Sequence, residues 1–423
     1  MDQLADHTNI KFLIAGHGNK MPSVRQAAER LSNVRICDFL TGTAFEHAVA
    51  ASSCGIVSLE QGLTGMCAPS KYYSYLQGGL PILAVAEQSS YLSKDVLYSE
   101  IGLCSDVGNG VQLTQNILQL YQDPELCKKM SDKIVRGLAY NGKVNVKCID
   151  TTELVEEARK IHDLSPVATA ALGRLLTMGC IMGSGLKEDN DTITLQIKAD
   201  GPLGSLNAVV NSNMEIKGYV QNPNVDLPLK DNGKLDVGTA VGKYGMLYII
   251  KDIGLKEPYV GLTPLVSGEI AEDFAEYFAK SEQTPSAIAL GVLVNKDGVK
   301  SAGGYMITPM PDATDEDISK LEENLKNIKP ISALLDEQKD LIEIARIVTG
   351  DKNVKLLEEQ KTPKYKCDCS RNRIEKGLIS LGKQELENII NTDGKAEIKC
   401  SFCKKKYDFN KEDLENLKEE CKK

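Results

Sequence analysis

The sequence predicts a multidomain protein with a Rossmann-like α/β fragment at residues 1–129, an α+β core at 130–310, a helical linker at 311–360 and a small, cysteine-containing α+β module at 361–423. Three observations lead to this prediction. The length of 423 residues exceeds that of one ordinary hydrophobic core. Apolar runs alternate with helix-like segments in the first third, whereas alternating strand patterns dominate the middle. Two closely spaced cysteine pairs lie near the C-terminus, among few large apolar residues.

Composition and charge are those of a soluble globular chain, because hydrophobic residues make up 42% of it and charged residues 26%. The net charge of −9 argues against a nonspecific partner such as nucleic acid or an anionic membrane. The longest apolar runs, such as Leu80–Ala86, have the length of a core strand rather than of a membrane span. The first residues lack the basic and apolar regions of a secretory signal. We therefore expect a cytoplasmic protein.

The first 129 residues are predicted to form a parallel layer of strands covered by helices. Residues 9–15 are an apolar strand run, and Gly16 and Gly18 follow it at once in a glycine turn. Further apolar runs at 54–59 and 81–85 are separated by helix-like segments and turn signals. Strands that alternate with helices are typical of a parallel, Rossmann-like sheet.

The character of the sequence changes at Met130, which is followed by a polar step and a strand and reads as an independent start. Alternating runs at 191–197 and 245–250 are predicted strands. Residues 269–281 have the apolar spacing of a helix that packs on a sheet. We expect an α+β core from here to about Met310. Residues 1–129 are then either a genuine fusion or a join between unrelated reading frames.

The segment after this core is predicted to be helical and only marginally stable by itself. Pro309 and Pro311 break the chain, and Thr314 or Asp315 can cap the helix that follows. Residues 315–360 carry many charges and thinly spread apolar positions. Such a segment stays folded only when it is docked on another part of the protein.

The four cysteines of the last segment are the strongest candidate site. Cys367 and Cys369 form a C-x-C pair, Cys400 and Cys403 form a C-x-x-C pair, and 30 residues separate the two pairs. Two such thiol pairs supply the four ligands of a tetrahedral Zn²⁺ site. A module of roughly 60 residues with a small core normally needs an additional stabilising link, such as a bound metal ion. The sequence therefore predicts a zinc-binding module that unfolds when the metal is removed.

Spacing alone leaves two interpretations of this centre open. It is either a purely structural zinc ribbon or a redox switch, because zinc-bound thiolates stay nucleophilic toward peroxide or hypochlorite and each pair has a resolving thiol beside it. A thioredoxin-like C-x-x-C is disfavoured, since no clear helix of a βαβ unit follows Cys403. The other eight cysteines are isolated and are interpreted as small buried hydrophobes. His162 is interpreted as a structural helix residue rather than a base.

Residues 130–423 resemble the heat-shock protein 33 family over their whole length. The resemblance is carried by strings that follow the order of the family, namely Ile149–Val155, Ile161–Pro166, Ala168–Arg174, Gly201–Gly204, Gly218–Val220, Pro258–Gly261, Ser267–Asp273, Ser281–Gln283 and Ala302–Tyr305. The motifs Cys367-Asp368-Cys369-Ser370 and Cys400-Ser401-Phe402-Cys403 match the zinc-binding pattern of the family.

This resemblance implies a chaperone core, a redox-sensitive linker and a zinc-binding switch module. The protein would be an ATP-independent holdase, inactive while reduced and bound to one Zn²⁺ per chain. Oxidation would form the local disulfides Cys367–Cys369 and Cys400–Cys403, release zinc, and unfold the module and the linker. The exposed apolar surface would bind unfolded client proteins, and the active form would be a homodimer. The resemblance implies no catalytic residues.

Residues 1–129 resemble a different family, the C-terminal, donor-binding half of a family 4 glycosyltransferase. The resemblance rests on three stretches, Ile14–Gly18, Pro69–Ile82 and Asp123–Leu126. It implies nucleotide-sugar binding at Gly16 and Gly18, with Lys71 neutralising phosphate. A nucleotide-sugar-dependent glycosyltransferase is therefore an alternative function, although the acceptor-binding half has no counterpart in the chain. A zinc-ribbon binding module is a third alternative.

Overall fold

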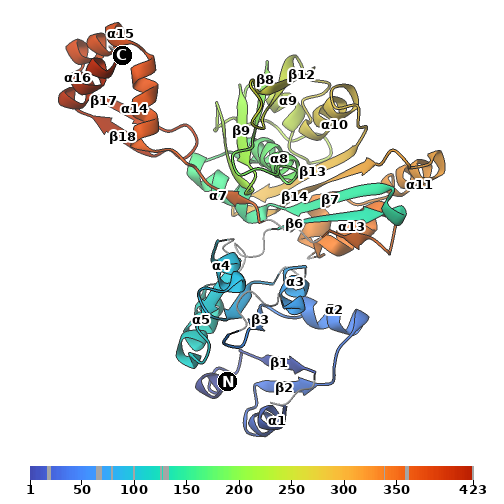
Figure 1. Cartoon of the computed structure of the whole chain (residues 1–423). Helices are drawn as coiled ribbons and strands as arrows, with labels where there is room; N and C mark the ends of the chain where they lie inside the picture. Colours follow the sequence, from blue (N-terminus) through green and yellow to red (C-terminus); the bar gives the residue numbers. More distant parts are fainter. Residues whose placement is uncertain are drawn as a thin grey trace.

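The computed structural model describes residues 1–16, 21–62, 69–77, 80–98, 101–123, 126, 133–337, 339–357 and 362–421. Figure 1 shows an N-terminal α/β part in blue, a central α+β part in green to orange, and a C-terminal module in red. The chain is thus a mixed α/β multidomain protein, as the sequence predicts. The predicted boundary at Met130 falls outside the described residues.

Parallel strands that alternate with helices make up the N-terminal part, as predicted. Its strands fall in two sheets, β1-β2 and β3-β4-β5, rather than in the one layer that the sequence pattern indicated. Strand β4 is the buried centre of the larger sheet, whereas β1 and β2 are only partly buried. The elements are η1 (Asp2–Leu4), β1 (Phe12–Ala15), α1 (Met21–Arg30), β2 (Val34–Cys37), α2 (Gly42–Ala50), β3 (Gly55–Ser58), α3 (Ser70–Gln77), β4 (Ile82–Val85), α4 (Tyr91–Tyr98), β5 (Gly102–Ser105) and α5 (Gly110–Gln122).

Two sheets form the central part. The five-stranded sheet has the order β13-β14-β7-β6-β15 and is antiparallel throughout. Its strands are β6 (Lys133–Ala139), β7 (Val144–Asp150), β13 (Ala287–Asn295), β14 (Gly298–Pro309) and β15 (Lys355–Leu356), and the 3₁₀ turn η2 (Tyr140–Gly142) joins β6 to β7.

The six-stranded sheet has the order β12-β11-β8-β9-β10-β16. Five of its strands form an antiparallel meander-like group, and β16, from the C-terminal third of the chain, adds parallel to β10. The strands are β8 (Thr192–Ala199), β9 (Leu206–Asn211), β10 (Glu215–Val220), β11 (Gly245–Asp252), β12 (Tyr259–Pro264) and β16 (Lys364–Tyr365). The predicted strands at 191–197 and 245–250 are confirmed as β8 and β11.

A single buried helix, α8 (Pro166–Gly183), packs against both sheets. Pro166 starts it, and the Ser165 hydroxyl accepts a hydrogen bond from the Ala168 amide at its N-terminus. Gly179 of α8 lets strand β10 approach the helix closely, since a Cβ there would lie 2.6 Å from the Ile216 side chain. Among the described residues α8 is the one helix long and apolar enough to cross a membrane, but 89% of it is buried inside the fold. It is therefore a core helix.

Three further helices complete the central part. Helix α7 (Thr152–His162) lies beside α8 and contacts β10 and β16, and α10 (Ile270–Lys280) packs on β12 and β13. The short helix α9 (Val237–Val241) contacts α8. Helix α10 confirms the helix expected at 269–281, with Phe274 and Tyr277 fully buried.

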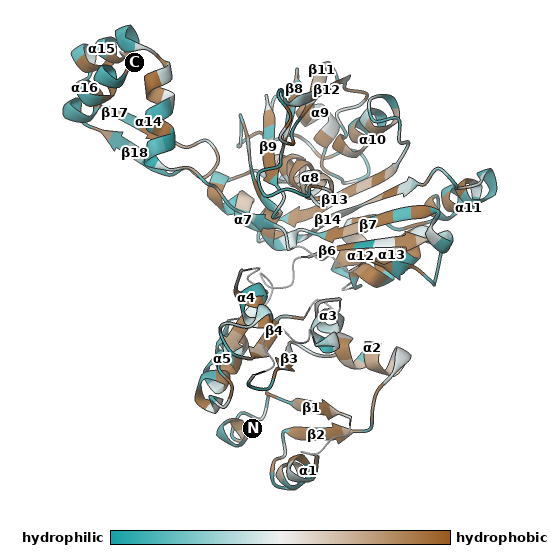
Figure 2. Cartoon of the chain, in the orientation of Figure 1, coloured by the Kyte–Doolittle hydropathy of each residue, from teal (hydrophilic) through white to brown (hydrophobic). Residues whose placement is uncertain are grey.

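The linker contains three helices, α11 (Asp315–Leu325), α12 (Ile331–Asp336) and α13 (Leu341–Thr349). Helices α12 and α13 cover the outer face of the five-stranded sheet, and α11 packs on α13. Thr314 caps α11 in a reciprocal capping box with Asp317, which selects between the two caps that the sequence allowed. The ribbons of α12 and α13 are largely brown, that is hydrophobic, in Figure 2. Their apolar side chains form one buried cluster with Val135, Val146 and Ile307 of the sheet. The charged segment is folded because it is docked.

The C-terminal module contains α14 (Arg371–Ser380), α15 (Lys383–Thr392), the hairpin β17 (Ala396–Lys399) and β18 (Lys406–Phe409), and α16 (Lys411–Glu420). The ribbons of its helices are coloured largely hydrophilic in Figure 2. Its own buried core is small and centres on Leu386, Phe409 and Leu414. The four predicted cysteines lie at the edge of this core.

The docking of α13 gives a first testable prediction. Ile344 is fully buried in the cluster between α13 and the sheet, so Ile344→Ala should leave a cavity and lower the free energy of unfolding of the linker by about 2–4 kcal/mol. Denaturant unfolding followed by hydrogen exchange of residues 331–349 measures this. Ile253→Ala, at a site that is 42% exposed, is the matched control and should change stability by less than about 1 kcal/mol. Equal effects of the two changes would contradict the docking.

Candidate metal centre

Two loops bring the four cysteines together. Cys367 and Cys369 lie between β16 and α14, whose first turn is capped by Ser370. Cys400 and Cys403 lie in the turn between β17 and β18. This turn is closed by backbone hydrogen bonds from the Cys400 amide to the Lys405 carbonyl and from the Lys404 amide to the Cys400 carbonyl, both 2.9 Å. Lys404 has a φ of 60°, a left-handed conformation that the tight turn requires.

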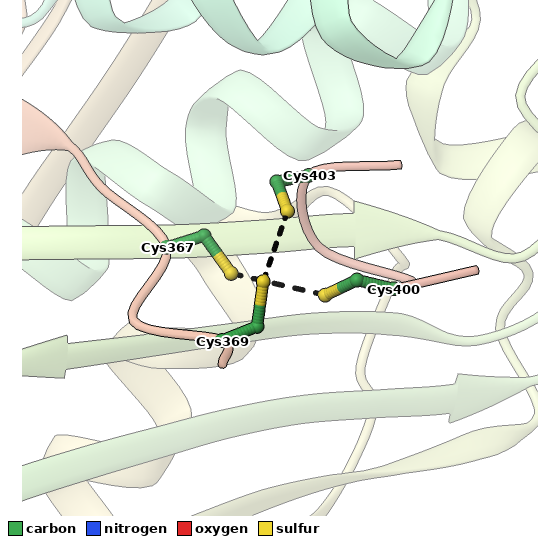
Figure 3. A group of neighbouring side chains, drawn as sticks. All are labelled: Cys367, Cys369, Cys400 and Cys403. Carbon is green, nitrogen blue, oxygen red and sulfur yellow. Dashed lines mark hydrogen bonds between the residues drawn. The ribbon is translucent and has the colours of Figure 1, made fainter. Parts of the chain in front are cut away.

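The four Sγ atoms converge on one point, as Figure 3 shows. All four lie within 4.8 Å of one another. The Sγ atoms of Cys367 and Cys400 are 3.8 Å apart, and those of Cys369 and Cys403 are 3.3 Å apart. Thiolates on a tetrahedral ion with bonds of about 2.3 Å lie about 3.8 Å from each other. The group can therefore hold a metal ion, and the sequence predicted all four of its members.

One phenol hydroxyl reaches a sulfur of the centre. The Tyr407 hydroxyl on β18 donates to Cys369 Sγ at 3.1 Å. Burial works to raise the pKa of Cys369, but hydrogen bonds outweigh it, the one from Tyr407 first, and lower that pKa to about 7. The pKa of Cys367 is instead raised, chiefly by burial. The two cysteines of the C-x-C pair therefore differ, and Cys369 is the one that most readily carries a negative charge.

The ligand loops also contact the central part of the chain. The Phe402 ring, between Cys400 and Cys403, packs edge-to-face on Tyr219 with centroids 5.1 Å apart, and Lys217 Nζ lies 5.2 Å from its centroid. Asp368, between Cys367 and Cys369, pairs with Lys217 and with Arg373. Strand β10 thus contacts a residue between the two cysteines of each motif.

A buried hydroxyl joins the same two parts. Tyr365 Oη lies 2.6 Å from the Phe402 carbonyl, 2.7 Å from the Gly218 carbonyl and 2.9 Å from His162 Nε2. Burial, followed by the nearby Lys404 cation, lowers the pKa of His162 to about 4. His162 is the last residue of α7 and is only 4% exposed, which agrees with its interpretation as a structural residue.

Sequence reasoning missed Tyr365 and Tyr407. Their partners lie far along the chain, since His162 is 203 residues from Tyr365. The available signal was the presence of a tyrosine two residues before Cys367 and another four residues after Cys403.

The structure says less about the three residues predicted to bind a nucleotide sugar. Gly16 follows β1 with a φ of 123°, which suits a structural glycine turn. Lys71 is exposed on α3, which packs on the other sheet of the N-terminal part. Gly18 lies outside the described residues.

Comparison with known proteins identifies relatives of the central and C-terminal parts of the chain. The model of a family described as "Hsp33 protein" matches residues 132–410. A 33 kDa chaperonin of Clostridium perfringens is 48% identical over 296 residues, which cover 70% of this chain and 92% of that protein. One of Acetivibrio thermocellus is 49% identical over 290 residues, which cover 68% and 97%. These comparisons do not bear out the resemblance of residues 1–129 to a glycosyltransferase.

A solved structure agrees with this placement. The crystal structure of the 33 kDa chaperonin (heat shock protein 33 homolog) from Thermotoga maritima matches with a TM-score of 0.64 and 40% identity, and covers 68% of this chain and 98% of its own. The matched fold therefore includes nearly all of that protein.

The hydroxyl of Tyr407 generates a second prediction. Tyr407→Phe keeps the ring but removes the donor to Cys369, so metal affinity should fall roughly 10-fold, the usual cost of losing an outer hydrogen bond to a ligand. Competition with a chromogenic chelator at fixed pH measures it. Tyr248→Phe on β11, outside the module, is the control. An unchanged affinity in Tyr407→Phe would show that the bond does not support the ligand.

His162 generates a third prediction, on pH. The folded pKa of about 4 lies below the ordinary 6.5, so the unfolded chain takes up the proton first as the pH falls. Stability is therefore complete above about pH 6.5 and is lost progressively toward pH 4. His162→Gln cannot titrate and should show a shallower loss in this window. Thermal unfolding of both proteins from pH 7 to 4.5 tests it, and parallel curves would contradict it.

Proposed function

The chain belongs to the Hsp33 family, and from this we propose that residues 130–423 are a redox-regulated, ATP-independent holdase chaperone. The observation that carries the proposal is the convergence of four thiols at a junction that also touches the core. A change in these thiols would therefore reach the core directly. Unfolded proteins are the proposed partners, in the cytoplasm, with no nucleic-acid, membrane or catalytic role.

The metal in this proposal is one Zn²⁺ held by Cys367, Cys369, Cys400 and Cys403. Four sulfurs at these separations fit its tetrahedral geometry. When bound, zinc holds the two loops together and contributes on the order of 10 kcal/mol to folding of a small module. The small apolar core of the module supports a need for such a contribution.

Oxidation would convert each cysteine pair into a local disulfide. We propose Cys367–Cys369 and Cys400–Cys403 as the pairs. In each pair, two thiolates lose two electrons, and one hydrogen peroxide takes up these electrons and two protons from solvent to become two waters. A sulfur in a disulfide no longer has the thiolate charge that a ligand needs, so oxidation and metal binding exclude each other at these residues.

The surface released by oxidation would be the outer face of the five-stranded sheet. Val135, Val146 and Ile307 lie there beneath α12 and α13. Loss of the module would leave the charged linker without its C-terminal neighbour, and release of α12 and α13 would expose this apolar face. Contiguous apolar surface binds unfolded chains without sequence preference. The active form is proposed to be a homodimer.

The proposal is tested with the full, reduced, zinc-loaded chain. Peroxide should release zinc, form one disulfide within each motif, and make the protein suppress light scattering by an unfolding client without ATP. Cys421→Ser, which removes a cysteine of the module outside the cluster, should respond like the unmodified chain, whereas Cys400→Ser should not hold zinc tightly. Zinc that stays bound under strong oxidant would indicate a purely structural ribbon. Zinc release without suppression of aggregation would refute the chaperone.

A further inference from the structure

We propose that Tyr365 couples the central core to the chemical state of the four cysteines, which is either metal-bound or oxidised. Its buried hydroxyl holds the Cys400–Cys403 turn to strand β10 and helix α7, and loss of this contact releases β16 from the core. Tyr365 is thus a positioning residue that acts through a backbone carbonyl of the ligand turn. The inference rests on the proposed function and names the part of the chain that transmits the switch.

The hydroxyl of Tyr365 is fully used in the docked arrangement. A hydroxyl has one proton, and two carbonyls, of Phe402 and Gly218, lie within 2.7 Å of this one. The single proton is therefore directed at these carbonyls, so His162 must donate from Nε2 at 2.9 Å. The Gly218 amide also donates to it, at 3.4 Å. Two donors and two acceptors surround one oxygen, in a residue that is 8% exposed.

The bond to Phe402 depends on the conformation of the metal-binding turn. Phe402 lies between Cys400 and Cys403, and two backbone hydrogen bonds and a left-handed Lys404 fix this turn. A shared bond of about 2 Å between the Cys400 and Cys403 sulfurs replaces the arrangement in which the four sulfurs surround one point. We infer that the turn shifts when this happens. The Phe402 carbonyl then moves relative to a hydroxyl that α7 and β10 hold in place.

The ladder between strand β16 and the core sheet is short. The strand pairs with β10 over only two residues, Lys364 opposite Glu215 and Tyr365 opposite Ile216. The flanking ion pair of Lys366 with Glu215 is partly exposed, with 60% of the lysine side chain accessible, and such pairs contribute little. The Tyr365 side chain is the buried anchor, because it packs in the main core cluster while its hydroxyl reaches the turn.

Amide hydrogen exchange measures directly whether β16 is docked on β10. The Lys364 amide donates to the Met214 carbonyl at 3.0 Å, and the Lys366 amide donates to the Ile216 carbonyl at 2.9 Å. Both amides are protected only while β16 lies on β10. Their exchange rates in the reduced, zinc-bound chain therefore report the contact without any assay of chaperone activity.

The test is Tyr365→Phe, which keeps the ring and removes the hydroxyl. We expect an unchanged zinc content, roughly 10-fold faster exchange of the Lys364 and Lys366 amides, as the loss of a buried hydrogen bond predicts, and a lower peroxide dose for β16 release. Tyr248→Phe on β11 is the control, since it removes a phenol hydroxyl from the core sheet away from the cysteine centre. It should leave the exchange of both amides unchanged.

Exchange at the unmodified rate in zinc-loaded Tyr365→Phe would overturn the inference. If that variant fails to fold, His162→Leu removes the donor to the same hydroxyl and should accelerate exchange of both amides by a smaller factor, and no acceleration there would overturn it equally. The holdase assay on the oxidised, unmodified chain is separate. Its failure would refute the proposed function while faster exchange in Tyr365→Phe still supported the coupling.

Discussion

The structure of the C-terminal half depends on one constraint, which is that the terminal module has too little apolar material to fold by burial alone. Its core is centred on Leu386, Phe409 and Leu414, and the four cysteines complete one side of it. A metal ion there would substitute for missing hydrophobic free energy. The fold of the module is then tied to the chemical state of four sulfur atoms. That dependence suits a switch better than a permanent scaffold.

The central part, in contrast to the terminal module, has a large buried apolar core. Helix α8 is buried against two sheets, and the cluster around it includes residues of almost every strand of the core. The linker helices instead contribute a separate cluster on the outer face of one sheet. Each side of that sheet is thus covered by an element of different stability, because α8 is surrounded on all sides whereas α12 and α13 are buried on one side only. Loss of the linker would leave the core intact.

The sequence predicts what depends on local pattern. Cysteine spacing identified all four candidate ligands, period-two alternation identified β8 and β11, and the proline break left Thr314 and Asp315 as the two candidate caps of α11. Contacts between residues that are far apart in the sequence could not be predicted. Strand β16 is two residues long, too short for any alternation, and its pairing with β10 follows from tertiary packing. The two sheets of residues 1–129 likewise reflect burial that alternation of strands and helices does not encode.

These features make the contact between strand β10 and the cysteine motifs the part of the structure that separates most easily. The metal centre and the central core are held more firmly. Strand β10 is shared, because it belongs to the core sheet and also contacts Asp368 and Phe402 of the ligand motifs. The two ion pairs Lys217–Asp368 and Lys366–Glu215 across the junction each include one exposed side chain, which solvent screens. The buried Tyr365 hydroxyl is different, since its partners pay a desolvation cost if it leaves. A junction built in this way is stable while both sides keep their shape and separates cooperatively when one side changes.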